Sequence, residues 1–175
     1  MSITAFKSAF KGGARNSLYR VQIEFPDIVS TEGLHDNFQF YCKGMQIPGV
    51  SNGTIEAWFQ GRSIKMAGDR QFQPISLNIV NDVDWKVRTA FERWSVLINS
   101  MQLNKGATLL ADYAATMTVE QLNRDGAVVA KYTFVDAWPQ DIASIELGHD
   151  QIDQIEEFTV TMEYQWWERV EAGII

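Results

Sequence analysis

Alternation of apolar and polar side chains dominates the chain and predicts a protein built mostly from strands. An apolar residue at every second position gives a strand one face toward a core and one toward water. Segments with this pattern begin near residues 19, 38, 54, 75, 117, 128 and 158. The last segment is the most regular, and its predicted inner face consists of Phe158, Val160, Met162, Tyr164 and Trp166.

The segments between these runs indicate where the predicted strands end. Phe38, Phe40 and Cys42 alternate with polar residues and predict a strand that ends at Gly44, after a polar loop at 27–36. Residues 123–126 (NRDG) predict a tight turn between two partner strands, because glycine permits a positive φ angle. We interpret residues 137–154, which include a Trp-Pro pair, as a long connection.

One segment changes from the strand period to the helix period. Its apolar residues recur at spacings of four and three, which predicts an amphipathic helix within residues 82–101. The asparagine and aspartates at 81, 82 and 84 are suited to cap a helix, and Asp84 and Arg88 are spaced to form an i,i+4 ion pair. A single helix among strands is expected to cover one sheet face or one end of a barrel. The apolar residues of this helix are Val87, Phe91, Trp94, Ile98 and Met101.

Two further segments predict contact with a partner. Residues 44–70 hold five of the twelve glycines and a basic cluster, around a predicted strand at 54–60. We interpret this stretch as an extended, exposed hairpin or loop. Residues 1–16 carry Phe6 and Phe10 at helical spacing and predict an N-terminal arm that docks on a neighbour.

Length and charge narrow the class of protein. A chain of 175 residues is most simply one domain, 1–175, and its net charge of −7 argues against binding nucleic acid through phosphates. The charge is uneven: four basic residues precede the first acid, Glu24, while residues 141–171 hold nine acids and one base. This segregation suits head-to-tail contacts between identical subunits, and it fits a solvated surface equally well.

Candidate chemistry is sparse. The one cysteine, Cys42, excludes an intramolecular disulfide and is interpreted as a small buried hydrophobe. His35 and His149 lack partners at metal-ligand spacing, and no phosphate-binding glycine motif occurs. We therefore expect no enzymatic activity, cofactor or metal. No apolar run approaches the roughly 20 residues of a membrane span.

Several motifs, in order along nearly the whole chain, resemble the tail tube proteins of contractile-tailed bacteriophages. The Asn81-Asp82 pair belongs to this set. The others are residues 40–49 (FYCKGMQIPG), 61–70 (GRSIKMAGDR), 88–94 (RTAFERW), 132–139 (YTFVDAWP) and 155–161 (IEEFTVT).

The resemblance implies a small antiparallel β-barrel or sandwich with one flanking helix. It implies six copies in a ring and rings stacked into the inner tail tube inside a contractile sheath, a conduit for DNA ejection. The implied partners are other copies of the chain, the sheath protein, the baseplate tube initiator, the tail terminator, the tape measure protein and passing DNA, which is not bound by sequence. The implied location is the tail of the virion, assembled in the bacterial cytoplasm.

The resemblance also assigns two sets of candidate residues. A hairpin that joins subunits or rings would use Gly44, Gly49, Arg62, Lys65, Asp69 and Arg70. A lumen through which DNA slides would suit the acidic, hydroxyl-rich residues of the last strand, although a solvated outer face fits them equally well. These residues are Glu157, Thr159, Thr161 and Glu163.

Three alternatives compete with a phage tail tube. One is the tube protein of an extracellular contractile injection system or of type VI secretion, which would not require an acidic bore. Another is a baseplate tube initiator, although such proteins usually carry extra domains. The third is an enzyme of unknown type, for which no residue pair with suitable chemistry and spacing is found.

Overall fold

The computed structural model describes residues 2–10, 13–29 and 34–171. Parts of the predicted N-terminal arm and of the predicted 27–36 loop, and the side chain of His35, lie outside the described residues. Within the described chain, seven antiparallel strands form one sheet in the order β1-β6-β7-β8-β5-β2, with β9 paired to β7. These strands are β1 Tyr19–Ile23, β2 Cys42–Met45, β5 Ile75–Val80, β6 Ala115–Leu122, β7 Val128–Ile142, β8 Glu157–Glu163 and β9 Trp166–Glu171.

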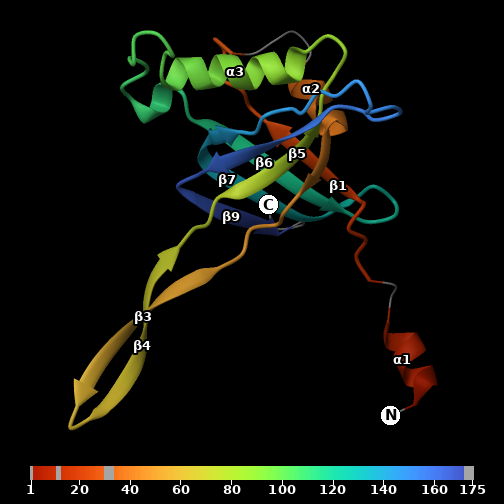
Figure 1. Ribbon diagram of the computed structural model, residues 1–175. Coiled ribbons are helices and arrows are strands. Elements are labelled where there is room, and N and C mark those ends of the chain that lie inside the picture. The colour runs from red at the N-terminus through yellow and green to blue at the C-terminus, as the bar shows by residue number, and fades with distance from the viewer. Residues whose placement is uncertain (1, 11–12, 30–33, 172–175) are drawn as a thin grey trace.

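Strand β7 carries the sheet from one layer of the fold to the other. Its first half pairs with β6 and β9, and its second half, from Trp138, pairs with β8. Between the two halves Asp136 has a positive φ of 54°, and the register shifts after Pro139. Bulges of this kind bend a strand. The bent sheet forms an open, sandwich-like fold (Figure 1), and the Tyr19 hydroxyl of edge strand β1 donates a hydrogen bond to the Cys42 carbonyl of edge strand β2 at 3.0 Å.

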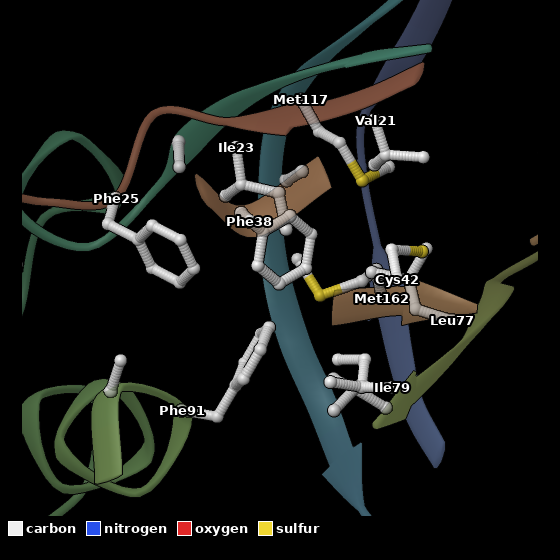
Figure 2. Packing of buried hydrophobic residues seen from close by; sticks show 14 of the residues in the cluster. Val21, Ile23, Phe25, Phe38, Cys42, Leu77, Ile79, Phe91, Met117 and Met162 are labelled. Atoms are coloured by element: carbon white, nitrogen blue, oxygen red, sulfur yellow. The ribbon is translucent and has the colours of Figure 1, made fainter. Parts of the chain in front are cut away.

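The core lies between the inward faces of these strands and the helices above them. Phe25, Phe38 and Phe91 come from three different segments and meet at its centre, with ring centroids 5.5 to 6.0 Å apart (Figure 2). The predicted inward residues of β5, at 75, 77 and 79, are all buried, as are 158, 160 and 162 of β8. The alternation therefore predicted these two central strands and their inner faces correctly.

Helix α3, Lys86–Ile98, confirms the predicted amphipathic helix, although it is shorter than the 82–101 range. Asp82 accepts hydrogen bonds from the backbone N–H groups of Lys86 and Val87, each at 3.1 Å, and so caps the first turn. The predicted pair of Asp84 with Arg88 is wrong. Asp84 lies 3.3 Å from Lys86, because it precedes the helix, and Arg88 pairs with Glu92 one turn later at 2.8 Å.

The predicted strand at 38–43 is also wrong. Helix α2 spans Leu34–Tyr41, and only Cys42–Met45 forms a strand, β2. Leu34 and Phe38 are buried one helical turn apart, while Phe40 is 75% exposed, as expected for a helix that buries one face. Three alternating apolar residues were too few to distinguish the two periods. Part of the predicted polar loop before them is therefore helical.

The predicted connection at 137–154 begins too early, because β7 continues through Trp138-Pro139 to Ile142. Proline is accepted there because it lies at a bulge, where a ladder hydrogen bond is already missing. Strand β8, which follows the connection, ends at Glu163. Trp166 therefore begins β9 and does not continue the inner face of β8, contrary to what the alternation predicts.

Two segments extend away from the body of the protein (Figure 1). Strands β3, Ser51–Phe59, and β4, Arg62–Gln71, form a separate two-stranded hairpin. Helix α1, Ile3–Ala9, has no buried residue, and its rings at Phe6 and Phe10 stack on each other at 5.3 Å. None of the described helices is long and apolar enough to cross a membrane.

Candidate assembly surfaces

The β3–β4 hairpin has one apolar face and one polar face. Cross-strand partners share a face, and the pairs Ile55 with Met66 and Ala57 with Ile64 place four apolar side chains together. Phe59, two residues after Ala57, continues this face to the tip. We call these five residues the apolar hairpin face. Its larger side chains, at positions 55, 59, 64 and 66, are 50% to 70% exposed.

The opposite face of the hairpin is largely polar. Lys65 lies across from Glu56, and its ammonium group is 3.5 Å from the carboxylate. Ser63 lies across from Trp58, which is 70% exposed. The hairpin therefore has one face with an ion pair and another face on which several exposed apolar side chains lie together.

A two-residue turn and a glycine crossing shape the hairpin. The turn residues Gln60 and Gly61 have φ angles of 47° and 81°, the positive values of a hairpin turn that matches strand twist. Near the base, a Cβ on Gly68 would lie 3.0 Å from the backbone of Gly53, so the two strands come closer than side chains permit. The register shifts at this place.

The predicted interface residues do not form one cluster. Arg62, Lys65, Asp69 and Arg70 all lie on β4 and are exposed. Gly44 lies in the body on β2, beside Asn78, and Gly49 lies in the segment that leads to the hairpin, where an added Cβ would meet nothing within 4 Å beyond its chain neighbours. Within the hairpin, the glycines with a backbone role are 61, in the turn, and 53 and 68, at the crossing. They lie in the predicted glycine-rich stretch but are not among the predicted interface residues.

The four predicted lumen residues share the outer face of β8. Glu157, Thr159, Thr161 and Glu163 alternate with buried residues, so they face away from the core. Two of their neighbours on β5 are also polar: Ser76 lies opposite Thr161 and Asn78 opposite Thr159, whereas Val80 lies opposite Glu157. Thr159 donates a hydrogen bond to the Asn78 side-chain oxygen at 3.1 Å. We call this surface the polar sheet face; it consists of Ser76, Asn78, Glu157, Thr159, Thr161 and Glu163.

A lysine at the edge of the polar sheet face is neutralised within the chain. The Lys43 ammonium group lies 2.5 Å from the Glu157 carboxylate. On the other layer, Glu120 is 8% exposed and lies between Arg20, at 3.5 Å, and Lys131, at 3.7 Å. Several basic side chains are therefore paired with acids of the same chain. Fewer cations are free to bind a partner than the number of Lys and Arg residues suggests.

The connection between β7 and β8 forms a second exposed surface of mixed character. We call residues 143–156 the acidic loop. It surrounds an open hollow of about 1260 Å³, and Leu147, Ile152 and Ile155 on it are 72% to 75% exposed. Its ends are held to the body, because Arg88 donates to the Ala143 carbonyl at 2.7 Å and Asn81 donates to the Glu156 carboxylate at 2.9 Å. The acids between these ends are Glu146, Asp150 and Asp153.

The candidate chemical groups do not assemble into a reactive site within the described residues. Burial raises the pKa of the Cys42 thiol to about 12, which keeps it protonated and a poor nucleophile. His149 lies exposed in the acidic loop. No group of three or more His, Cys, Asp or Glu side chains in the described part of the chain is placed to hold a metal ion.

Comparison with known families shows which class of protein has this sequence. The phage tail tube protein family matches residues 14–170. The chain belongs to this family. The tail tube protein of Enterobacteria phage T4 is 29% identical over 163 residues, which cover 91% of this chain and 95% of that protein. The resemblance found in the motifs is confirmed, and the protein is a structural tail tube protein of the contractile-tail type.

Solved structures with the same fold come from related machines. A chain in the baseplate of the anti-feeding prophage has a TM-score of 0.70 at 14% identity, covering 94% of this chain and 100% of that chain. A chain in the sheath-tube complex of an extracellular contractile injection system has a TM-score of 0.64 at 18% identity, covering 98% and 99%. At these identities the likeness establishes the fold, which is mainly β and sandwich-like, as the resemblance implied.

Proposed function

We propose that this tail tube protein forms hexameric rings that stack into the inner tube of a contractile phage tail, through which genome DNA is ejected. The observation that carries this proposal, beyond family membership, is the polar sheet face. It has no large apolar side chain at its centre, and it joins hydroxyl, amide and carboxylate groups on two neighbouring strands. Such a surface is suited to line a water-filled bore.

The charge of this face supports DNA as the cargo. Duplex DNA carries one negative charge per roughly 1.7 Å of its axis, and cationic side chains would hold it through its phosphates. Glu163 repels phosphate, and Glu157 neutralises Lys43, so that this lysine does not attract phosphate. In the proposed tube, Thr159 and Thr161 offer hydroxyls without charge, so DNA slides past without adhering.

The same proposal gives roles to the exposed segments. The hairpin, with Arg62, Lys65, Asp69 and Arg70, joins neighbouring subunits or rings, and the segments at Gly44 and Gly49 lead into that joint. Helix α1 docks on a neighbour through Ile3, Phe6 and Phe10, which are 56% to 73% exposed. The further partners are the sheath, the baseplate tube initiator, the terminator and the tape measure protein. The assembly takes place in the host cytoplasm and remains in the virion tail.

A second candidate function is the tube of a contractile injection system that delivers protein. The fold likeness to such systems favours it. The two functions differ in what the bore must exclude, because a protein cargo sets no general requirement for an anionic lining. The acidic residues of the polar sheet face therefore favour DNA.

Electron microscopy of the purified protein tests the proposal. We expect negatively stained six-fold rings or tubes with a central hole, either spontaneously or after addition of a nucleating baseplate. Tubes of a Thr159→Lys, Thr161→Lys variant should form normally but retain labelled duplex DNA at low salt, whereas wild-type tubes should not. A protein that stays monomeric even with the baseplate present would contradict the proposal.

A further inference from the structure

We propose that the apolar hairpin face of one copy seats on the acidic loop of a second copy, in a head-to-tail contact that repeats along the assembly. This inference rests on the proposed function in that it needs copies of the chain to associate. It goes further, because it names the two surfaces that meet and the face of the hairpin that is buried. It also assigns a role to the acidic loop, which the family motifs leave without one.

The hairpin lacks a core of its own. An isolated two-stranded hairpin is marginally stable in water, and it needs packing against another element to persist. Among the described strands, β3 and β4 pair only with each other. Ile55, Phe59 and Ile64 on its apolar face are 53%, 70% and 58% exposed. Contiguous exposed apolar side chains of this kind mark an interaction surface.

The acidic loop has the features that this face requires of a partner. Its exposed side chains at Leu147, Ile152 and Ile155 offer apolar contact around an open hollow of about 1260 Å³. The hollow is open to solvent, so a segment of another chain has access to these side chains. The hollow is lined by one continuous stretch of chain.

Charge complementarity selects a second copy as the occupant. Arg62 and Arg70 on β4 have no ion pair within the described residues, and the same holds for Glu146, Asp150 and Asp153 on the acidic loop. The hairpin thus offers apolar groups beside two free cations and one free anion, Asp69, and the loop offers apolar groups beside three free anions. Complementary potentials of this kind fix the register of a contact and exclude like surfaces.

The two surfaces lie too far apart to meet within one molecule. In Figure 1 the hairpin extends from one side of the body, and the blue acidic loop lies on the other side, near α3. A contact between different patches on identical chains is heterologous, so each copy keeps one free surface of each kind. Such contacts build rings or filaments, the geometry that a stacked tube requires.

The polarity of the hairpin decides which face turns inward. Glu56 and Lys65 on the polar face already pair with each other, and burying them would remove two charges from water. Between the turn and the register shift, the apolar face carries one charged side chain, Arg62. Arg62 shares the apolar face through its pairing with Phe59. In the proposed contact its guanidinium group pairs with an acid of the loop, which offsets the cost of removing this charge from water.

Disulfide trapping between copies tests this contact. Wild-type Cys42 remains in place, because it is buried. Ile64→Cys combined with Ile152→Cys should give a ladder of covalent oligomers on a non-reducing gel after tubes are oxidised. The matched control, Ser63→Cys with Ile152→Cys, moves the thiol by one residue to the polar face and should give at least tenfold less ladder.

The outcomes separate this inference from the proposed function. Tubes that form with both double variants but show no ladder for Ile64→Cys, or an equal ladder for Ser63→Cys, would overturn the contact while leaving the tube intact. Wild-type protein that never forms tubes would overturn the proposed function together with the contact.

A charge swap gives a second, independent measurement. Arg62→Glu with Arg70→Glu should raise the critical concentration for tube growth at least tenfold, and adding Asp150→Arg with Asp153→Arg should restore most of that loss. Restoration by the loop substitutions supports direct contact. A quadruple variant no better than the hairpin double variant would contradict it.

Discussion

The body of the protein and its β3–β4 hairpin use the same sequence pattern for different ends. In β5 and β8, alternation places Leu77 and Val160 in the core, both 0% exposed. In the hairpin, the same alternation places Phe59 and Ile64 together on one face, but these side chains are 70% and 58% exposed. The body completes its core within one chain. The hairpin has half a core, and in the proposed contact the other half comes from another molecule.

Substitution in the body should have the largest effect on the folded monomer. Phe91 is fully buried and contacts Phe25, Phe38 and Trp94 through its ring. Phe91→Ala should lower the free energy of unfolding by about 3–5 kcal/mol, because it removes a large buried side chain and leaves a cavity. Urea denaturation of the monomer measures this loss. A loss near that of a surface substitution, about 0.5 kcal/mol, would show that the body does not depend on this aromatic cluster.

Charge reversal in the hairpin should have the largest effect on assembly. Changing Arg62, Lys65 and Arg70 together to Glu should block tube growth, with a rise in critical concentration on the order of 100-fold, or about 2.7 kcal/mol. The monomer should remain folded, because all three side chains are exposed. Sedimentation of polymer and circular dichroism of the soluble fraction measure the two effects. Tubes of normal length from the triple variant would contradict an interfacial role for these bases.

A pair of neighbouring aromatic residues divides the hairpin into its two faces. Phe59→Ser should raise the critical concentration about tenfold, since about 1.4 kcal/mol of apolar contact is lost from each joint. Trp58→Ser, at the same 70% exposure but on the opposite face, should change it less than threefold, or about 0.6 kcal/mol. Both variants should unfold as the wild type does, within about 0.5 kcal/mol. Equal effects on assembly would mean that the two faces are not distinguished.

The contrast between body and hairpin also explains what the sequence predicts well. Strands β5, β8 and the β6–β7 hairpin follow from alternation over several residues, and α3 follows from its helical period. Helix α2 was missed because only three apolar residues in its segment alternate. The extension of β7 through Pro139 was missed because its position at a bulge depends on pairing with β8, which no local pattern records.

The sequence predicts some of the candidate surfaces better than others, for a related reason. The shared outer face of Glu157, Thr159, Thr161 and Glu163 follows directly from a two-residue period. The hairpin's apolar face depends on cross-strand register, which pairs Ala57 with Ile64. The sequence drew attention to its basic residues and glycines instead. The position of the acidic loop across the body depends on the whole fold, so it could not be inferred from the chain alone.

Removing a helix cap should give the smallest effect and complete the contrast with the hairpin. Asp82→Ala removes the acceptor for the N–H groups of Lys86 and Val87, and should lower the free energy of unfolding by about 1 kcal/mol. Asp82→Asn keeps an acceptor oxygen and should lose less than half as much. Because Asp82 lies in the body, the critical concentration of either variant should stay within about twofold of wild type, which corresponds to roughly 0.4 kcal/mol. If Asp82→Ala instead impaired growth as much as Phe59→Ser does while both monomers stayed folded, assembly would depend on the order of the body as well as on the hairpin. The distinction between a body that completes its core within one chain and a hairpin that needs a second copy would then be wrong.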